Sequence, residues 1–310
     1  MEEKIEIMNL LQNKQILEHE LQSLAYGSVE IRENNSNKYI YIHYREDGVA
    51  LTKYVGEYSD ELYNLILNNN IKAKQLKKQI REITRNLKQF NYIEEELSAE
   101  VEKNIDFVKR HLVDTIYKQA ILEGVATTFA DTESIIEGGK VNNMTSEDIL
   151  KIVNLKHAWE FILNKNVILS NTNFALLCEI NKMVEEGFYY SAGKIRNVPV
   201  TIGGTTWKPD LPIESVIKEE LEEIFNKEIN DVEKSIELLL YTMKKQIFID
   251  GNKRTSVIYS NHYLISKGKG IIAIPAELTE EFKDLLILYY EGKDENKIKE
   301  FIKEKCYISI

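Results

Sequence analysis

Proline is absent from residues 1–198 of this chain. Only four prolines occur in 310 residues, and three of them fall between residues 199 and 212. Because proline lacks a backbone donor and breaks helices, long Leu-, Ile-, Lys- and Glu-rich stretches without it favour α-helix. We therefore expect a mainly α-helical chain, long enough for one large or two moderate domains with ample core.

Composition narrows the class of protein. The net charge of −10 argues against nucleic-acid binding by the whole chain, because phosphate backbones need clustered Lys and Arg. The two cysteines, Cys178 and Cys306, lack metal-binding spacing and predict a reducing compartment without disulfides. The acidic start MEEKIEIMNLL does not resemble a signal peptide, and no apolar run reaches the roughly 18 residues of a membrane span. We expect a cytoplasmic protein without a membrane partner.

The first 95 residues read as a separate module. Helical spacing of apolar residues over 4–24 gives way to strand alternation at 28–33, 38–44 and 50–55. Turn residues at 34–37 and Asp47-Gly48 separate the strands, and a long helix follows over 59–90. This pattern predicts a helix, a three-stranded antiparallel meander and a helix, forming a domain over 1–95 that serves partner or target selection.

Two features of this module leave its partner open. Its second helix carries seven cations and one acid, Glu82, between residues 72 and 88. The charges indicate either a solvated face or a basic arm for an acidic partner or RNA. The strands carry Tyr39, Tyr41, Tyr44 and Tyr54, which could stack on bases or pack on the flanking helices. A nucleic-acid partner is thus possible for the module, although not for the core.

The remainder, 96–310, is expected to be a helical domain. A helix is predicted over 100–123, and a second begins at Thr145, which forms a capping box with Asp148. Further helices are predicted over 173–186, 213–225 and 231–245, and a last helix runs to Lys267 and ends before Gly268. Between the third and fourth of these, runs at 198–202 and 205–208 flank Gly203-Gly204 and predict a small β-hairpin. The helices at 59–90 and 100–123 could also form a dimer contact.

The stretch KKQIFIDGNKRTSV, residues 244–257, indicates a phosphate site. Gly251 permits a tight turn, and the helix beginning at Asn252 points its free N–H groups into that turn, which suits an anion. Arg254 adds a guanidinium that can clamp phosphate, and Asp250 adds a carboxylate suited to Mg²⁺ shared with a nucleotide. Phe248 is the expected core anchor. An ordinary polar turn is the alternative, but the added cations favour metal-assisted phosphoryl or nucleotidyl transfer.

The same stretch resembles the signature of the Fic family (Fic/Doc, or Fido, domains), His-x-Phe-x-Asp/Glu-Gly-Asn-Gly/Lys-Arg-x-x-Arg. Phe248, Asp250, Gly251, Asn252 and Arg254 match it in register. Upstream, AGKIRNVPVTIGGTTWKP is similar to the family's Gly-x-x-Arg element and β-hairpin flap, and SIIEGG resembles its inhibitory helix. The resemblance covers roughly residues 100 to 305 and implies a Fic-like helical bundle.

The resemblance also implies an activity. Fic proteins usually transfer AMP from ATP to a Ser, Thr or Tyr hydroxyl of a target protein. The cofactors implied are therefore Mg²⁺ and ATP or another nucleotide. By position, Asp250 would bind Mg²⁺, and Gly251 and Asn252 would form the anion hole. The other residues expected to bind the nucleotide are Phe248, Lys253 and Arg254. Glu137 would be the inhibitory or hydrolytic glutamate. The flap docking the target protein would comprise Val198, Val200, Ile202, Thr205 and Trp207.

Three positions depart from the family's pattern. Gln246 stands in place of the histidine base, whose contribution is on the order of 10²–10⁴ in rate. Val257 replaces the second arginine. Lys253 stands where typical members have glycine, and lysine at this position also occurs in the kinase-like Doc branch. Three interpretations are open: a divergent adenylyltransferase or Doc-like phosphotransferase; a hydrolase that removes AMP with Glu137; or an inactive nucleotide sensor or antitoxin-like partner.

Overall fold

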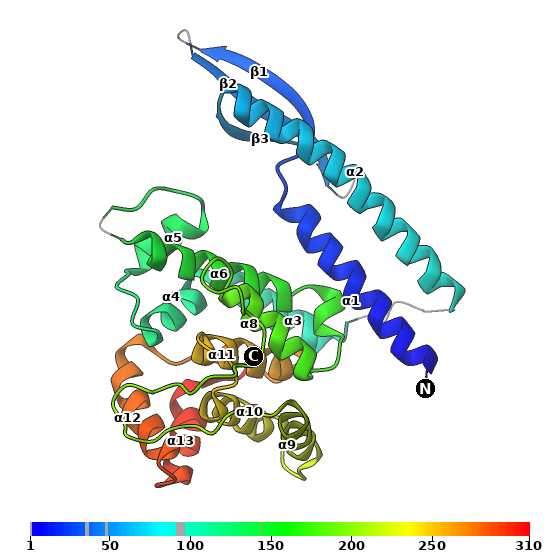
Figure 1. The fold of residues 1–310 in the computed structure, drawn as a ribbon. Coiled ribbons are helices and arrows are strands. Elements are labelled where there is room, and N and C mark those ends of the chain that lie inside the picture. Colours follow the sequence, from blue (N-terminus) through cyan, green and yellow to red (C-terminus); the bar gives the residue numbers. More distant parts are fainter. Residues whose placement is uncertain (1, 35–36, 47–48, 91–96, 143) are drawn as a thin grey trace. The chain divides into compact units, whose positions relative to one another are not determined.

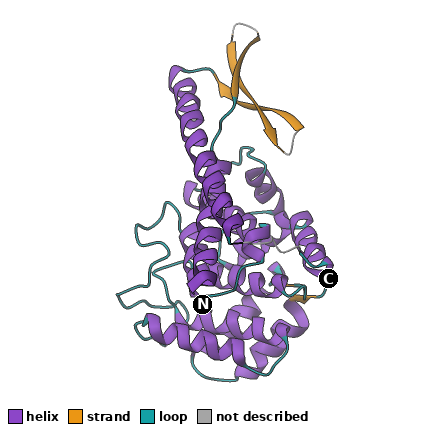
Figure 2. Cartoon of the chain, turned by 90° about the vertical axis from the view of Figure 1, so that its right-hand side faces the viewer, coloured by secondary structure: helices purple, strands orange, loops and turns teal. Residues whose placement is uncertain are grey.

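The computed structural model describes residues 2–34, 37–46, 49–90, 97–142 and 144–310. The chain divides into two compact units, Met1–Glu95 and Glu96–Ile310. The division falls within 91–96, outside the described residues, as do Asn35, Ser36, Asp47 and Gly48 of the predicted turns. Helices dominate, and Figure 2 shows how few strands there are. The prediction of a mainly α-helical chain is confirmed.

The first unit is a pair of helices with a meander between them. It contains α1 (Glu2–Ser23), β1 (Ser28–Asn34), β2 (Asn37–Glu46), β3 (Val49–Glu57) and α2 (Asp60–Gln89). The strands pair antiparallel in the order β1-β2-β3, as predicted. Ser59 caps α2, since its side chain accepts a hydrogen bond from the Leu62 N–H. The sheet packs on the first half of α2, and α1 packs along the rest of it (Figure 1).

The two faces of the meander differ. Ile40 and Ile42 are buried with Ile66 of α2. Alternation places Tyr39, Tyr41 and Tyr54 on the opposite face, where Tyr41 and Tyr54 have ring centroids 5.4 Å apart. Three of the four tyrosines therefore pack on one another, and only Tyr44 joins the core between sheet and helix. The predicted packing of all four on the flanking helices is wrong for these three.

The second unit is a helical bundle. Its longer helices are α3 (Ala99–Arg110), α4 (Leu112–Leu122), α5 (Phe129–Ile136), α6 (Ser146–Ile162), α8 (Phe174–Val184), α9 (Glu214–Asn226), α10 (Asp231–Lys245), α11 (Asn252–Ser266) and α12 (Thr279–Tyr290). The shorter elements are α7 (Lys165–Ile168), β4 (Ile271–Ile272), η1 (Ala276–Leu278), α13 (Glu295–Phe301), the π-helical turn η2 (Ile302–Cys306) and β5 (Tyr307–Ile308). Strand β5 pairs antiparallel with β4.

Helix α11 is the centre of this unit. Every residue from Arg254 to Ile265 is buried, and the helix contacts α3, α6, α7, α8 and α10. Buried hydrogen bonds join it to its neighbours, because Ser235 of α10 donates to the Ser260 carbonyl and Asn261 donates to the Ile272 carbonyl. The functional turn at the N-terminus of α11 is consequently held on a rigid element.

Two predicted elements are wrong in this unit. The helix expected over 100–123 is interrupted at His111, whose φ of −111° and ψ of 20° end α3 and start α4. No strand forms at 198–202 or 205–208, so the predicted β-hairpin flap is an irregular loop. Pro199 cannot donate to a ladder, and Arg196 holds the two ends of the loop by donating to the carbonyls of Val198 and Asp210.

In the described parts of the chain, no helix is long and apolar enough to cross a membrane.

Candidate functional site

The turn between α10 and α11 uses two left-handed residues. Gln246 ends α10 with φ of 48°, and Gly251 precedes α11 with φ of 72°. Between them, Phe248 is buried as the predicted anchor. The Asn252 side chain fixes this anchor, since its Oδ1 accepts from the Phe248 N–H (3.0 Å) and its Nδ2 donates to the Phe248 carbonyl (2.9 Å). That side chain is therefore structural, and only the backbone of Asn252 is left for an anion.

The start of α11 presents free donors. The first N–H groups of a helix have no intrahelical acceptor, and the first such bond here runs from the Thr255 N–H to the Gly251 carbonyl. Asp250 lies beside them, 49% exposed, with Oδ1 accepting from the Gly251 N–H at 2.7 Å. Its Oδ2 lies 3.7 Å from Arg254 Nη2. The second carboxylate oxygen of Asp250 is accordingly accessible at the mouth of the turn.

Arg254 is buried among carboxylates. Its side chain is 2% exposed, with Nη2 2.8 Å from Glu185 Oε1 and Nε 3.7 Å from Glu123 Oε1. The Nε and Nη1 groups have no hydrogen-bond partner, and neither has Glu123 Oε2. Buried guanidinium donors without partners are rare in folded proteins, so this cluster favours an additional anionic or polar ligand.

Glu185, which the sequence analysis did not single out, lies against the turn. A Cβ atom added to Gly251 would lie 2.3 Å from Glu185 Oε1, so the carboxylate fills the space that glycine leaves. Burial raises the pKa of Glu185 from 4.5 to about 7, while Arg254 opposes that rise and Asp250 and Glu123 add to it. Near neutral pH this site can gain or lose a proton.

Buried amides position the turn. Gln119 donates its Nε2 to the Arg254 carbonyl (2.7 Å) and accepts from the Trp159 indole at its Oε1 (2.8 Å). Asn181 donates to the Asp250 carbonyl and accepts from the Gly193 N–H. Helices α4, α6 and α8 thereby fix the backbone around Asp250 and Arg254. No local motif in the sequence distinguishes these amides from other polar residues.

Arg196, of the predicted Gly-x-x-Arg element, closes the base of the flap loop. It is 2% exposed, and its guanidinium donates to the carbonyls of Gln246, Val198 and Asp210 at 2.6, 2.8 and 2.6 Å. Its N–H donates to the Ile247 carbonyl. One side chain thus attaches both ends of the loop to the signature turn.

A cavity of about 320 Å³ lies between the turn, the loop and α12. The predicted site residues that line it are Val200, Ile202, Gln246, Asp250, Asn252 and Lys253. Glu123, Gly203, Lys283 and Tyr290 complete much of its wall. Its size falls in the usual range for a small-molecule site, and it combines apolar wall with a few converging charges.

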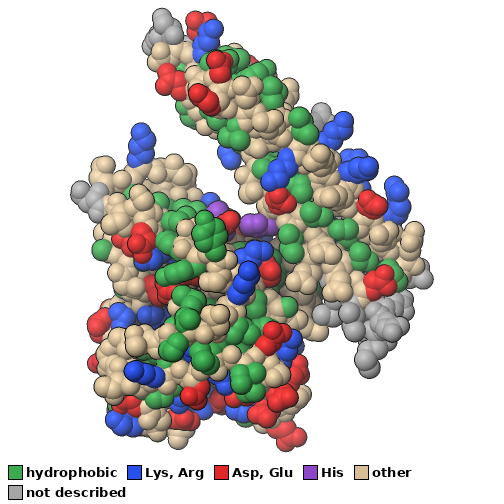
Figure 3. Space-filling view, viewed as in Figure 1, with side chains coloured by type: hydrophobic (Ala, Val, Ile, Leu, Met, Phe, Trp, Pro, Cys, Tyr) green, Lys and Arg blue, Asp and Glu red, His purple; other side chains and the backbone are tan. Residues whose placement is uncertain are grey.

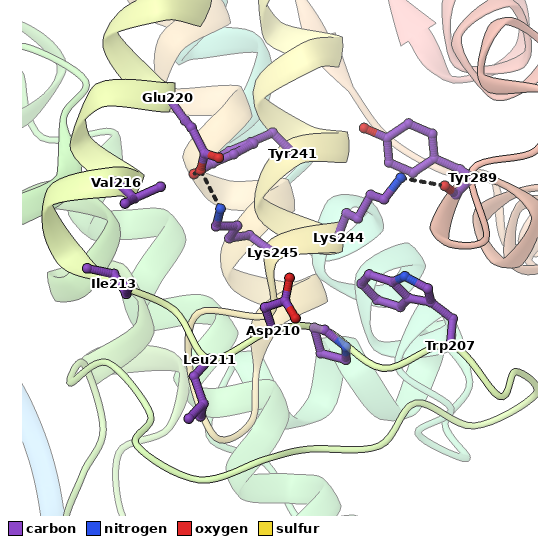
Figure 4. A pocket seen from close by; sticks show the side chains of 11 residues that line it. Trp207, Asp210, Leu211, Ile213, Val216, Glu220, Tyr241, Lys244, Lys245 and Tyr289 are labelled. Atoms are coloured by element: carbon purple, nitrogen blue, oxygen red, sulfur yellow. Dashed lines mark hydrogen bonds and ion pairs between the residues drawn. The ribbon is translucent and has the colours of Figure 1, made fainter.

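The other predicted flap residues lie outside this cavity. Val198 is 46% exposed, Thr205 donates to Glu291 at 2.8 Å, and the Trp207 ring stacks on Tyr290 at 5.5 Å. Phe248 and Gly251 do not line the cavity and act by shaping the turn. Trp207 instead lines a second pocket of about 440 Å³, which Figure 4 shows. Its other lining residues include Leu211, Lys244, Lys245 and Tyr289.

Gln246 lines the cavity, and its amide cannot itself act as a general base. Its Nε2 donates to the Met243 carbonyl at 2.7 Å, which leaves Oε1 as an acceptor. The histidine nearest to it in the sequence, His262, is buried and bonded at both ring nitrogens to Thr172 and the Val167 carbonyl. Burial lowers the pKa of His262 to about 4, and the ring does not line the cavity. It cannot replace the missing base.

The structure does not bring Glu137 to this site. Glu137 is the exposed C-cap of α5, whereas Glu123 lines the cavity, with its Oε1 3.8 Å from Lys253 Nζ. The sequence contains two Glu-Gly pairs that each follow two aliphatic residues, Glu123-Gly124 and Glu137-Gly138. Glu137 was predicted at the site, but the glutamate that lines the cavity is Glu123. Glu123 therefore occupies the position at the cavity that was predicted for Glu137.

The donor set fits a magnesium ion that is shared with a nucleotide. In the described part of the chain, no group of three or more His, Cys, Asp or Glu side chains could hold a metal by itself. Asp250 offers one accessible carboxylate oxygen at the start of α11. Mg²⁺ commonly takes one or two protein carboxylates and completes its shell with phosphate oxygens and water.

Comparison with known proteins agrees with this geometry. The sequence model of the Fic/DOC family matches residues 171–264, which span α8, the flap loop and the signature turn. A search of curated proteins found no match. Among solved structures, Fic-1 from C. elegans is similar with a TM-score of 0.53 and 17% identity, covering 79% of this chain and 77% of that one.

Two bacterial structures share the fold as well. A Fic domain containing signaling protein from Bacteroides thetaiotaomicron has a TM-score of 0.53 and 17% identity over 67% of this chain and 85% of its own. A Fic family protein from Desulfovibrio desulfuricans has a TM-score of 0.52 and 15% identity over 66% of this chain and 68% of its own. Residues 171–264 therefore match the Fic/DOC family model, and the fold of the second unit is similar to that of solved Fic-domain structures.

Proposed function

We propose that the second unit is a Fic-type adenylyltransferase that binds a magnesium–adenine nucleotide and transfers AMP slowly to a protein hydroxyl. The observation that carries the proposal is the cavity of about 320 Å³, whose lining includes Asp250, Lys253 and Gln246. The match of residues 171–264 to the Fic/DOC family model supports this class of reaction.

The chain's own residues would act by binding and positioning. Phosphate oxygens would meet the N–H groups at the start of α11 and the cations of Lys253 and Arg254. Asp250 would hold Mg²⁺, which supplies charge neutralisation on the phosphates. The target hydroxyl oxygen would attack the α-phosphorus as the bond to the pyrophosphate oxygen breaks. Loop residues Val200 and Ile202 also line the cavity and would cover the nucleotide.

Gln246 would limit the rate. Its Oε1 can accept a hydrogen bond from the target hydroxyl and orient it, but an amide cannot take the proton. The proton must then pass to solvent, which forgoes general-base help worth on the order of 10²–10⁴ in rate. A slow transferase is the expected result.

A second activity is favoured by one contact pattern. Glu123 Oε2 has no hydrogen-bond partner and the residue lines the cavity, so it could activate a water and remove AMP from a modified protein. This is the hydrolytic role first predicted for Glu137, moved to the glutamate that the cavity contains.

Transfer of label from nucleotide to a panel of candidate target proteins tests the proposal. The Gln246→His variant should label a target about 10²–10⁴ times faster than the native chain with α-labelled ATP. Label arriving only from the γ position would indicate a Doc-like phosphotransferase. Tight binding of Mg-ATP by calorimetry without labelling in either protein would indicate a nucleotide sensor. Absence of binding would refute the proposal in every form.

A further inference from the structure

Five cations form one face of α2. Lys74, Lys78, Arg81, Arg85 and Lys88 follow one another at intervals of four, three, four and three residues, and all five are exposed. At about 100° per residue they fall within an arc of about 80°, and at 1.5 Å per residue they extend over about 21 Å. We call these five residues the basic face. Figure 3 shows Lys and Arg side chains projecting from this unit.

The basic face differs from the other cations of its segment. The other two cations of this segment are engaged, since Lys72 pairs with Glu20 at 2.7 Å and Lys77 lies over the Tyr26 ring at 4.5 Å. Among the described residues, no carboxylate lies within ion-pair distance of any of the five. Like charges three and four residues apart destabilise a helix, and an ordinary solvated face mixes both signs. This face is arranged for an external anion.

The remainder of the helix excludes one class of anionic partner. A helix that lies on a lipid surface inserts an apolar face opposite its charges. On α2 the residues opposite the basic face, including Ala73, Leu76 and Leu87, are already buried against α1. No apolar face remains for a membrane along this half of the helix.

We propose that the basic face of α2 binds nucleic acid through its phosphate backbone. The cations recur at a mean rise of about 5 Å along a straight line, which suits a polymer with an anion at every residue. Exposed Leu67 and Ile71 continue the four-three spacing towards the N-terminus of the helix. They offer apolar contact to sugars and bases beside the phosphates. An acidic protein would need carboxylates at the same regular intervals.

The interaction is independent of the nucleotide cavity. It requires only the cations of the basic face, which are clustered although residues 1–95 as a whole carry 13 Lys and Arg against 15 Asp and Glu. Binding by phosphate contacts alone carries no sequence preference, and its affinity falls steeply with salt because counterions are released. The salt dependence is therefore the diagnostic measurement.

The test uses the full chain and fluorescein-labelled DNA and RNA of one sequence, as duplex and as single strand. Anisotropy titrations at several salt concentrations give the slope of log affinity against log salt. The variant K78Q/R81Q/K88Q removes three cations from exposed positions and keeps good helix formers. We expect its slope to be shallower by about 2.7 on a duplex, or about 2.1 on a single strand.

The matched control is K103Q/K109Q/R110Q, which removes the same charges from exposed positions of α3. Its slope should equal that of the native chain. Equal slopes for both variants, or no binding of any nucleic acid at low salt, would overturn the proposal. The proposal would also be overturned if the native chain bound poly-glutamate or anionic vesicles but no nucleic acid, and if K78Q/R81Q/K88Q lost that binding. Circular dichroism of the variants excludes unfolding as the cause.

Discussion

Two helices of the second unit end on nearly the same four residues. Residues 121–124 read Ile-Leu-Glu-Gly and end α4, and residues 135–138 read Ile-Ile-Glu-Gly and end α5. Glu123 and Glu137 are the C-caps, with φ of −84° and −82°. Each is followed by a glycine with φ of 80°. The local backbone of the two segments is the same.

Their surroundings differ completely. Glu123 lies near Lys253 and Arg254 and lines the cavity, while Glu137 faces solvent. The cause lies one turn earlier, where Gln119 of α4 hydrogen-bonds the Arg254 carbonyl and fixes that helix end at the signature turn. A helix end followed by glycine is thus a common structural element, and tertiary contacts alone decide whether its glutamate reaches the site.

The prediction with the largest expected effect tests how strongly a tertiary contact constrains the turn at Gly251. The φ angle of Gly251, 72°, is similar to those of the glycines that follow Glu123 and Glu137. Unlike at those glycines, a Cβ atom added to Gly251 would lie 2.3 Å from Glu185 Oε1. Gly251→Ala should lower the free energy of unfolding by roughly 3 kcal/mol, from backbone strain together with overpacking. Chemical denaturation measures this. A loss under about 1 kcal/mol would show that the Glu185 side chain moves freely away.

The second prediction concerns the proton at Glu185. Its pKa is raised to about 7, so the folded state binds a proton more readily than the unfolded chain, and this contribution to stability falls as pH rises from 4.5 to about 7. The full difference corresponds to at most about 3 kcal/mol. Arg254, Asp250, Glu123 and Lys151 are the charges that act on it.

Glu185→Gln removes this titration. We expect the unfolding free energy of the variant to depend less steeply on pH between 5 and 7, by about 1–2 kcal/mol over the interval. Denaturant titrations at several pH values compare the two proteins, and only the difference in slope is used, because the variant also weakens the pairing of Arg254. Parallel curves would contradict a raised pKa.

Sequence reasoning succeeded where local chemistry decides. Helix α10 has the predicted bounds, Thr145 caps α6 by accepting from the Asp148 N–H, and Gly268 follows α11 in a left-handed conformation. The signature turn could likewise be predicted, because glycine, a helix start and adjacent cations are consecutive. Each of these features is complete within a few residues.

It failed where distant residues decide. Glu185 and Asn181 reach the turn from the end of α8, and nothing in their local sequence marks them. The flap was predicted as a hairpin from glycines and alternating residues, yet Arg196 holds it as a loop through three carbonyls. The two Glu-Gly pairs are the sharpest example, since one local pattern supplied two equal candidates.

The third prediction tests the two glutamates directly. Glu123→Ala removes a negative charge near Lys253 and Arg254, so Mg-nucleotide should bind about tenfold more tightly, equivalent to about 1.4 kcal/mol. Glu137→Ala is the matched control and should bind as the native chain does, because that side chain lies outside the cavity. Calorimetry compares the three proteins. Equal changes in both variants would mean that the cavity is not the nucleotide site.

The smallest effect tests whether the two segments are locally equal. Gly124 and Gly138 both have φ of 80°, and a Cβ added to either would meet no atom within 4 Å. Backbone strain is then the whole cost of an alanine, about 1 kcal/mol at each position. We expect Gly124→Ala and Gly138→Ala to lower the free energy of unfolding by the same amount, within the error of denaturant titration. A clearly larger loss for Gly124→Ala would mean that the cavity side strains this helix end beyond its local conformation, and would refute the equivalence of the two segments.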